Sequence, residues 1–97
     1  MLFRSTGSLV IDDGALRALR GGKSLLPAGV RRVAGRFERG DTVSVVDAAG
    51  REVARGIVAY GDVDAARIIG RQSAEIESLI GIRGRDELIH RDDLVMQ

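Results

Sequence analysis

The chain has 97 residues, of which 44% are hydrophobic and 30% charged, and this composition is typical of one small globular domain spanning 1–97. Its apolar runs are too short to cross a membrane, and its first residues lack the basic and apolar regions of a secretory signal. With no cysteine, one histidine and a net charge of +1, the sequence excludes disulfides and an ordinary zinc site, and we expect a cytoplasmic protein.

The first third of the chain predicts a strand followed directly by a helix. Residues 9–11 are aliphatic and form the strand, and Asp12 can cap the helix that follows. Gly21 and Gly22 end this helix, and Pro27-Ala28-Gly29 then predicts a tight turn. The apolar face of the helix consists of Ala15, Leu16 and Leu19.

The middle third alternates between apolar and polar residues, which is typical of strands. Three strands are predicted at 31–38, 42–47 and 51–60, with reversals at Gly40 and around Gly50, and we expect them to form an antiparallel meander. The residues expected to be mostly buried are Val33, Val43, Val45 and Ile57 here and Leu79 further along the chain.

The last third returns to helical spacing. Asp62 is expected to cap a helix that ends at Gly70, and Ser73 to cap a second helix that ends at Gly81. Strands are predicted at 87–90 and 94–96. The fold class is therefore mixed α/β and mainly β, a compact barrel of short, mostly antiparallel strands. The apolar positions of the two helices are Ala65, Ala66 and Ile69 in the first, and Ile76, Leu79 and Ile80 in the second.

Three short motifs imitate catalytic sites, and none has the required context. Gly22-Lys23-Ser24 lacks the earlier glycine of a phosphate-binding loop, because that position is Arg17, and it follows a helix instead of a strand. The triplet at 90–92 resembles the kinase catalytic loop but lacks its asparagine. Adjacent carboxylates such as Asp92 and Asp93 point in different directions, so they do not form an acid/base pair. The sequence predicts no catalytic residue and no metal site.

The positive charge is concentrated near the start of the chain. Residues 1–36 hold seven basic and two acidic side chains, whereas residues 61–97 hold five basic and eight acidic ones. A basic cluster of this kind suits contacts to RNA phosphates, and the alternative is a solvated face that keeps the domain soluble. Aromatic stacking on bases is poorly supported, because the chain has three aromatic residues. The candidate RNA-binding residues are Arg17, Arg20, Lys23, Arg31 and Arg32.

Several separated segments resemble the PUA domain. They are residues 24–30 (SLLPAGV), 37–43 (FERGDTV) and 53–56 (VARG), together with Gly14-Ala15. The residue Ala28 inside the Pro-x-Gly turn and the segments 68–70 (IIG), 73–76 (SAEI), 79–81 (LIG) and 89–93 (IHRDD) are most similar to the C-terminal PUA domain of bacterial glutamate 5-kinases. The resemblance implies a PUA-like pseudo-barrel with a helix after the first strand and two short helices before the last.

The resemblance also implies two alternative functions. PUA domains of RNA-modifying enzymes bind RNA through the first helix, the following loop and neighbouring strands, which correspond here to the region holding Arg17, Arg20 and Lys23. The alternative is a structural or regulatory domain that packs on an amino acid kinase domain or mediates oligomerisation, without RNA. The kinase domain of such an enzyme binds ATP and magnesium and phosphorylates glutamate in proline biosynthesis. No part of this chain resembles it, so we expect no enzymatic activity and no cofactor for the chain alone.

Overall fold

The computed structural model describes residues 7–82 and 84–97. The chain alternates short strands with short helices, and three single turns of 3-10 helix (η1 to η3) join them. Along the sequence the elements are β1 (Gly7–Ile11), α1 (Asp13–Arg20), η1 (Pro27–Gly29), β2 (Val30–Gly35), β3 (Thr42–Val46), β4 (Glu52–Ile57), α2 (Asp62–Ile68), η2 (Ser73–Glu75), α3 (Ile76–Ile80), η3 (Arg91–Asp93) and β5 (Leu94–Met96).

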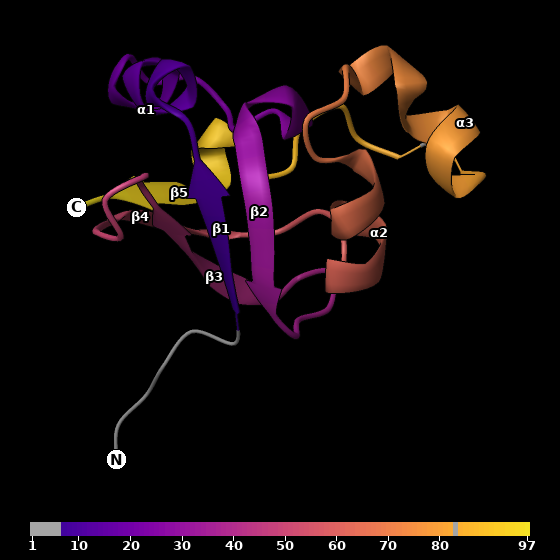
Figure 1. Cartoon of the computed structure of the whole chain (residues 1–97), viewed down its shortest axis with the longest axis horizontal. Helices are drawn as coiled ribbons and strands as arrows, with labels where there is room; N and C mark the ends of the chain where they lie inside the picture. Colours follow the sequence, from indigo (N-terminus) through magenta and orange to yellow (C-terminus); the bar gives the residue numbers. More distant parts are fainter. Residues whose placement is uncertain (1–6, 83) are drawn as a thin grey trace.

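The five strands form one mixed sheet in the order β2-β1-β3-β4-β5 (Figure 1). β1 pairs antiparallel with β2 and parallel with β3, and the pairs β3–β4 and β4–β5 are antiparallel. The predicted meander of three consecutive strands is therefore wrong at its first connection, because β1 lies between β2 and β3. Alternation of apolar and polar residues shows which residues face the core, but it does not distinguish a central strand from an edge strand.

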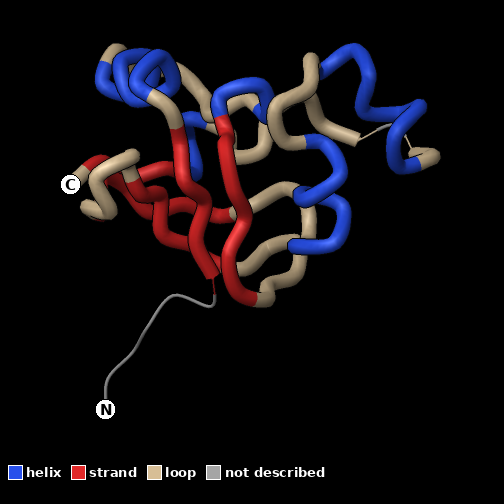
Figure 2. Tube along the Cα trace, viewed as in Figure 1, coloured by secondary structure: helices blue, strands red, loops and turns tan. Residues whose placement is uncertain are grey.

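The predicted fold class, mixed α/β and mainly β, is confirmed. α1 follows the first strand at one end of the sheet. α2 and α3 precede the last strand, with α2 next to the edge strand β2 and α3 further out, beyond α2 (Figure 2). Every helix of the described chain is too short or too polar to cross a lipid bilayer. Closure of the sheet into a pseudo-barrel stays a prediction.

The core lies between the sheet and the segments that cross its inner face. Leu9 and Ile11 of β1 and Val43 and Val45 of β3 are fully buried, as alternation on adjacent parallel strands requires. Phe37 is also buried, although it follows β2 instead of belonging to it, and Val33 is half-buried. The other buried hydrophobic residues are Leu19, Leu25, Val30, Ala54, Val58, Tyr60, Ala65, Ile68, Ile76, Leu88 and Ile89.

The prediction that Ile57 is buried is wrong, since 45% of this residue is exposed. The inward-facing positions of this region are Ala54, Gly56 and Val58, so Ile57 points outward from the end of β4. Gly56 takes an inward position because Ile89 packs directly on it: a Cβ added there would lie 2.6 Å from Ile89 Cγ2. Ile57 is the larger and more hydrophobic residue, so the sequence pattern favoured the wrong face.

The predicted tight turn at Gly29 and the predicted reversal at Gly40 are both present. The Gly29 amide donates to the Leu26 carbonyl over 3.1 Å, which closes the turn at η1. Gly40 has a φ of 94° between β2 and β3, a conformation that glycine adopts without strain.

The helix α2 begins one residue earlier than predicted. Its N-cap is Gly61, and the Asp62 side chain instead accepts a hydrogen bond of 3.2 Å from the Phe37 amide. Ala65 and Ile68 are buried, whereas Ala66 is exposed and Ile69 half-buried.

The second predicted helix is split into η2 and α3. Ser73 does not cap it: its hydroxyl donates to the Asp86 carbonyl over 2.8 Å, and the Glu75 carboxylate accepts from the Gln72 amide over 3.0 Å. Gly81 ends α3 with a φ of 82°, as predicted. Ile76 is buried, and Leu79 and Ile80 are half-buried.

The strand predicted at 87–90 is reduced to a single bridge between Leu25 and Ile89. Leu88 and Ile89 are nevertheless fully buried, so their hydrophobicity was read correctly. The piece predicted at 94–96 is β5, which pairs with β4.

Asp47 organises the turn between β3 and β4. Its Oδ1 accepts hydrogen bonds of 2.9 Å from the amides of Ala49 and Arg51, and Arg51 Nε lies 3.6 Å from Oδ2. The hydrogen bond from the Arg51 amide is the largest cause that lowers the pKa of Asp47. Partial burial of the carboxylate opposes it, while the Ala49 amide and the Arg51 charge act in the same direction as the first bond.

Val45→Ala should reduce the free energy of unfolding by about 1–3 kcal/mol, because it removes two buried methyl groups and leaves a cavity in the core. Val95→Ala makes the same chemical change at a position that is 70% exposed, and it should change stability by no more than about 0.5 kcal/mol. Urea unfolding of both variants tests this expectation. Equal effects of the two substitutions would contradict the strand register.

Acid should weaken the fold partly through Asp47. Its pKa is lower in the folded chain than in the unfolded chain, so its stabilising contribution is present above the ordinary aspartate pKa and disappears as the pH falls through the folded value. Asp47→Asn keeps an oxygen acceptor but removes the charge, and its unfolding midpoint in urea should vary less with pH below about 5 than that of the wild type. If the unfolding midpoints of the two proteins changed with pH in the same way, Asp47 would not contribute to the loss of stability in acid.

Candidate nucleic-acid interface

The first helix starts two residues after the end of β1, an interior strand of the sheet. Asp12 is its N-cap, and Asp12 Oδ1 accepts a hydrogen bond of 2.7 Å from the Ala15 amide, as the sequence predicted. The Asp12 amide donates to the Gly29 carbonyl over 3.0 Å. One residue therefore ties α1 both to β1 and to the turn η1 that leads into β2.

Packing of α1 on the core determines where its basic residues point. Leu19 is buried and Ala15 and Leu16 are half-buried, so Arg17 and Arg20 are exposed on the remaining surface of the helix. Both arginines belong to its last turn, where the partial negative charge of the helix end favours cations.

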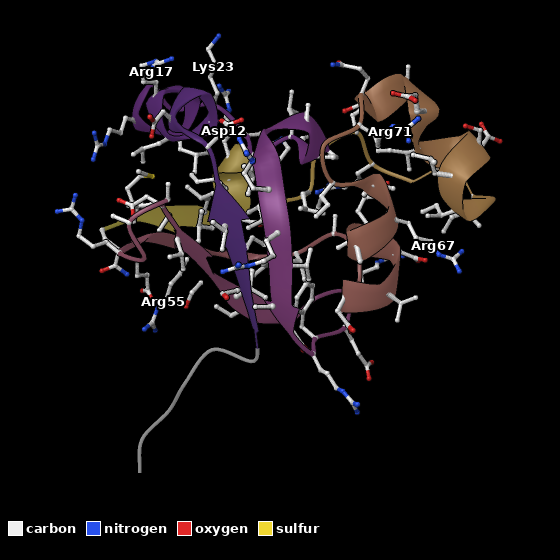
Figure 3. The ribbon with its side chains drawn as sticks, in the orientation of Figure 1. Asp12, Arg17, Lys23, Arg55, Arg67 and Arg71 are labelled. Atoms are coloured by element: carbon white, nitrogen blue, oxygen red, sulfur yellow. The ribbon has the colours of Figure 1, made fainter. Side chains whose placement is uncertain are left out.

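Lys23 extends this basic end of α1 into the following loop. Its amide donates to the Ala18 carbonyl over 3.0 Å, which holds the loop against the last turn of the helix. Arg17 and Lys23 project from the same end of the molecule (Figure 3). The structure thus brings Arg17, Arg20 and Lys23 together at the end of one helix.

Arg31 and Arg32 lie on β2, which is an edge strand of the sheet. In a regular strand one of two consecutive side chains would face the core. The pairing shifts by one residue here, because Val10 lies opposite Arg32 whereas Ile11 lies opposite Val30. This bulge leaves Arg31 and Arg32 both exposed.

Sequence reasoning missed the C-terminal residues that border this surface. The Arg91 amide donates to the Ser24 hydroxyl over 2.8 Å, and the bridge between Leu25 and Ile89 continues the contact. The exposed Arg91 therefore lies beside the loop that holds Lys23. The two segments are 67 residues apart in sequence, and no local pattern indicates that they meet.

The candidate cations have no acidic partner, whereas four of the eight other arginines that the structure describes do have one. Across residues 7–82 and 84–97, Arg51, Arg55, Arg71 and Arg85 form ion pairs with carboxylates, and the five candidate residues form none. Their charges are therefore not neutralised by the fold. We call the surface formed by Arg17, Arg20, Lys23, Arg31 and Arg32 the basic surface.

The rest of the described chain offers no alternative chemistry at this surface. Phe37 and Tyr60, the aromatic residues that the structure describes, are both buried and so do not offer a face on which a base could stack. Within the same residues, no group of three or more histidine, aspartate or glutamate side chains could hold a metal ion. The basic surface can form charge-assisted hydrogen bonds to phosphates or other anions.

The profile of the PUA domain matches residues 7–80, which is most of the chain, and the chain belongs to the PUA domain family. Its curated relatives include glutamate 5-kinases. It is 60% identical over 94 residues to the glutamate 5-kinase of Paramagnetospirillum magneticum, covering 97% of this chain and 25% of that protein. It is 61% identical over 90 residues to the glutamate 5-kinase of Rhizobium johnstonii, covering 93% of this chain and 23% of that protein.

Solved structures share the fold at low sequence identity. A PUA domain protein of Aeropyrum pernix has a TM-score of 0.64 and 22% identity, covering 88% of this chain and 41% of that one. An H/ACA ribonucleoprotein bound to a substrate RNA has a TM-score of 0.60 and 19% identity, covering 90% of this chain and 25% of that one. The chain spans about a quarter of the length of the kinases that it matches, and it corresponds to their C-terminal portion.

Asp12→Ala should lower the free energy of unfolding by about 1 kcal/mol, because it leaves the Ala15 amide at the start of α1 without its acceptor. Asp12→Asn is the matched control, since asparagine caps helices about as well as aspartate. Unfolding in urea measures both. An alanine variant as stable as the asparagine variant would show that the cap does not hold α1 in place.

Proposed function

We propose that residues 1–97 act as a non-catalytic accessory PUA domain that binds structured RNA through the basic surface. The observation that carries this proposal is a set of five exposed cations on α1, the following loop and β2, none of them paired with an acid in the described chain. Such unneutralised arginines suit bidentate contacts to phosphate oxygens. The domain needs no cofactor for this function.

The structural relatives support the same proposal. Two of the solved structures with this fold are H/ACA assemblies, and one of them is bound to a substrate RNA. Phosphates and sugar hydroxyls would be the main contacts here, because no exposed aromatic side chain is present among the described residues. Affinity for RNA is therefore expected to depend strongly on salt and weakly on base sequence.

The test is a salt titration of RNA binding. The wild type and the triple variant Arg17→Ala, Arg20→Ala, Lys23→Ala are compared on one RNA hairpin with a stem of about 16 base pairs, between about 50 and 200 mM salt. The triple variant should bind more weakly, and the dependence of log Kd on log salt should flatten by up to about three phosphate contacts. Its folding should be intact, because the three side chains lie outside the core.

A control variant separates this surface from general charge. Arg36→Ala, Arg39→Ala, Arg67→Ala also removes three exposed cations, but from the loop after β2 and from α2. It should change the salt dependence much less than the first variant. Equal slopes for the wild type and the Arg17, Arg20, Lys23 variant would overturn the assignment of the basic surface.

A second candidate function is favoured by the sequence identity to glutamate 5-kinases. In this alternative the domain is structural or regulatory: it packs on a kinase domain or mediates oligomerisation, without RNA. The kinase domain of such an enzyme would bind ATP and magnesium and act in proline biosynthesis. A packing face away from the basic surface would allow the domain to perform both functions. The groove described below is a candidate for this face.

A further inference from the structure

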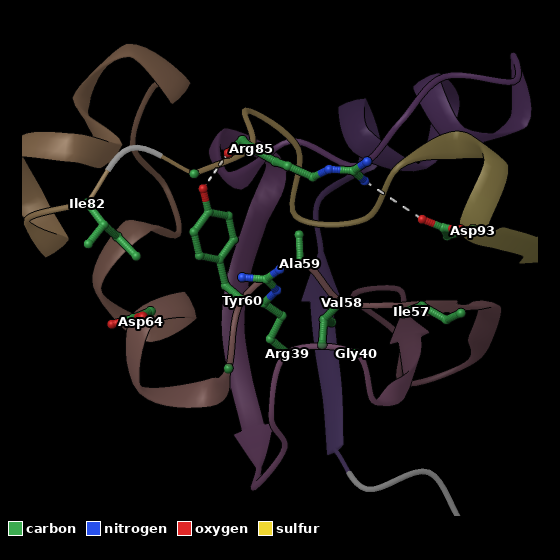
Figure 4. Close-up of a pocket in the computed structure, with 12 residues that line it drawn as sticks. Arg39, Gly40, Ile57, Val58, Ala59, Tyr60, Asp64, Ile82, Arg85 and Asp93 are labelled. Carbon is green, nitrogen blue, oxygen red and sulfur yellow. Dashed lines mark hydrogen bonds and ion pairs between the residues drawn. The ribbon is translucent and has the colours of Figure 1, made fainter.

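A groove of about 600 Å³ lies outside the basic surface (Figure 4). One wall is the loop that holds Arg39 and Gly40, the other is the segment with Gly84 and Arg85, and residues 57–61 form the floor. The Tyr60 hydroxyl donates to the Arg85 carbonyl, so the floor and the second wall are directly connected.

The lining of the groove has the composition of a protein interface. Ile57 and Ile82 are 45% and 55% exposed and lie at its two ends, whereas Val58 and Tyr60, which also line the floor, are almost completely buried. Large aliphatic residues with this exposure, surrounded by polar side chains, are typical of surfaces that bind another protein domain.

The charges of the groove argue against a polyanion as its occupant. The lining holds two cations, Arg39 and Arg85, and two anions, Asp64 and Asp93. One ion pair forms among them, with Arg85 Nη1 3.9 Å from Asp93 Oδ2. A groove with two cations and two anions does not attract phosphates as the unpaired cations of the basic surface do. It suits a partner that carries charges of both signs around an apolar centre.

The groove also lies close to the place where the chain enters the sheet. Gly7, the first residue of β1, packs on Phe37: a Cβ added to Gly7 would lie 2.5 Å from the Phe37 ring. The Phe37 carbonyl accepts a hydrogen bond of 2.9 Å from the Asp62 amide, next to Gly61 of the groove. The first described residue of the chain is thus linked to the edge of the groove through Phe37 and Asp62.

We infer that this groove docks a protein domain that precedes the PUA domain on the same chain, through Ile57 and Ile82. The inference rests on the second candidate function and deepens it by naming the contact surface. The kinases that match this chain devote about three quarters of their length to other sequence, and their matching region is the C-terminal portion. A small interface is sufficient, because covalent linkage gives an effective concentration in the millimolar range.

The experiment uses the absence of cysteine in this chain. Single thiols are introduced as Ile82→Cys and Ile57→Cys in the groove, and as Ala49→Cys in the exposed turn at the far end of β4, about 17 Å from Ile57 along the strand. Each variant is made in two contexts. One is the 97-residue chain, and the other is the glutamate 5-kinase of Paramagnetospirillum magneticum in which this chain replaces the matching region.

Maleimide labelling, read for each thiol by peptide mass spectrometry, measures how accessible each site is. Both groove thiols should react about tenfold more slowly in the fusion than in the isolated chain, because an interface with a Kd of about 0.1 mM is about 90% closed at a millimolar effective concentration. The Ala49→Cys thiol should react equally fast in both. Retained turnover of glutamate by the fusion shows that its kinase domain is folded.

The remaining outcomes overturn the inference in distinguishable ways. Protection of Ala49→Cys but not of the groove thiols would show that the domains pack through another face, so the groove would be wrong and the second candidate function right. Labelling that is unchanged by fusion at all three sites would overturn the groove as the docking surface, and packing of the two domains would then have to use a face that carries none of the three thiols. Protection of Ile82→Cys in the isolated chain by the RNA hairpin would show that the occupant is RNA and not a protein domain.

Discussion

The arrangement of this domain depends on β1 being paired on both sides. Gly7–Ile11 pairs with β2 along one side, and Ser8, Leu9 and Val10 also pair with β3 along the other, so the middle of β1 is hydrogen-bonded on both sides. Leu9 and Ile11 can then be completely buried at the centre of the molecule. Because α1 begins two residues after Ile11, the same pairing also determines where the first helix lies. A terminal strand with unpaired edges would leave that helix without a fixed position.

The basic surface depends on the position of β1 in the sheet and on three further structural features. The Asp12 cap and its bond to Gly29 hold α1 near the start of β2. The bulge opposite Val10 and Ile11 keeps two consecutive arginines of β2 in solvent. The segment that ends at Arg91 supports the intervening loop through Ser24. The contact between Arg91 and Ser24 joins segments that are 67 residues apart, so the sequence around either residue does not reveal it.

The two surfaces differ in how their charges are balanced. Arginines of the basic surface have no carboxylate partner in the described chain, whereas Arg85 of the groove is close to Asp93. An unbalanced surface favours a polyanion through release of counterions, and a balanced one with exposed isoleucines favours burial of apolar area against a protein. RNA binding and packing on a preceding domain are therefore compatible in one molecule. They would use different residues and respond differently to salt.

The sequence by itself determined the helix after the first strand, its Asp12 cap, the glycine reversals, the hydrophobic positions of β1 and β3, and the five basic candidates, because these follow from local propensity and spacing. The place of β1 between β2 and β3, the outward direction of Ile57, and the meeting of Arg91 with Ser24 were decided by tertiary structure. The physical reason is that strand order and long-range contacts maximise burial and hydrogen bonding over the whole chain. Ile57 faces outward because Gly56 takes the inward position, where Ile89 packs directly on it. Ile89 is 33 residues further along the chain than Gly56, so the residues around Ile57 do not reveal this contact.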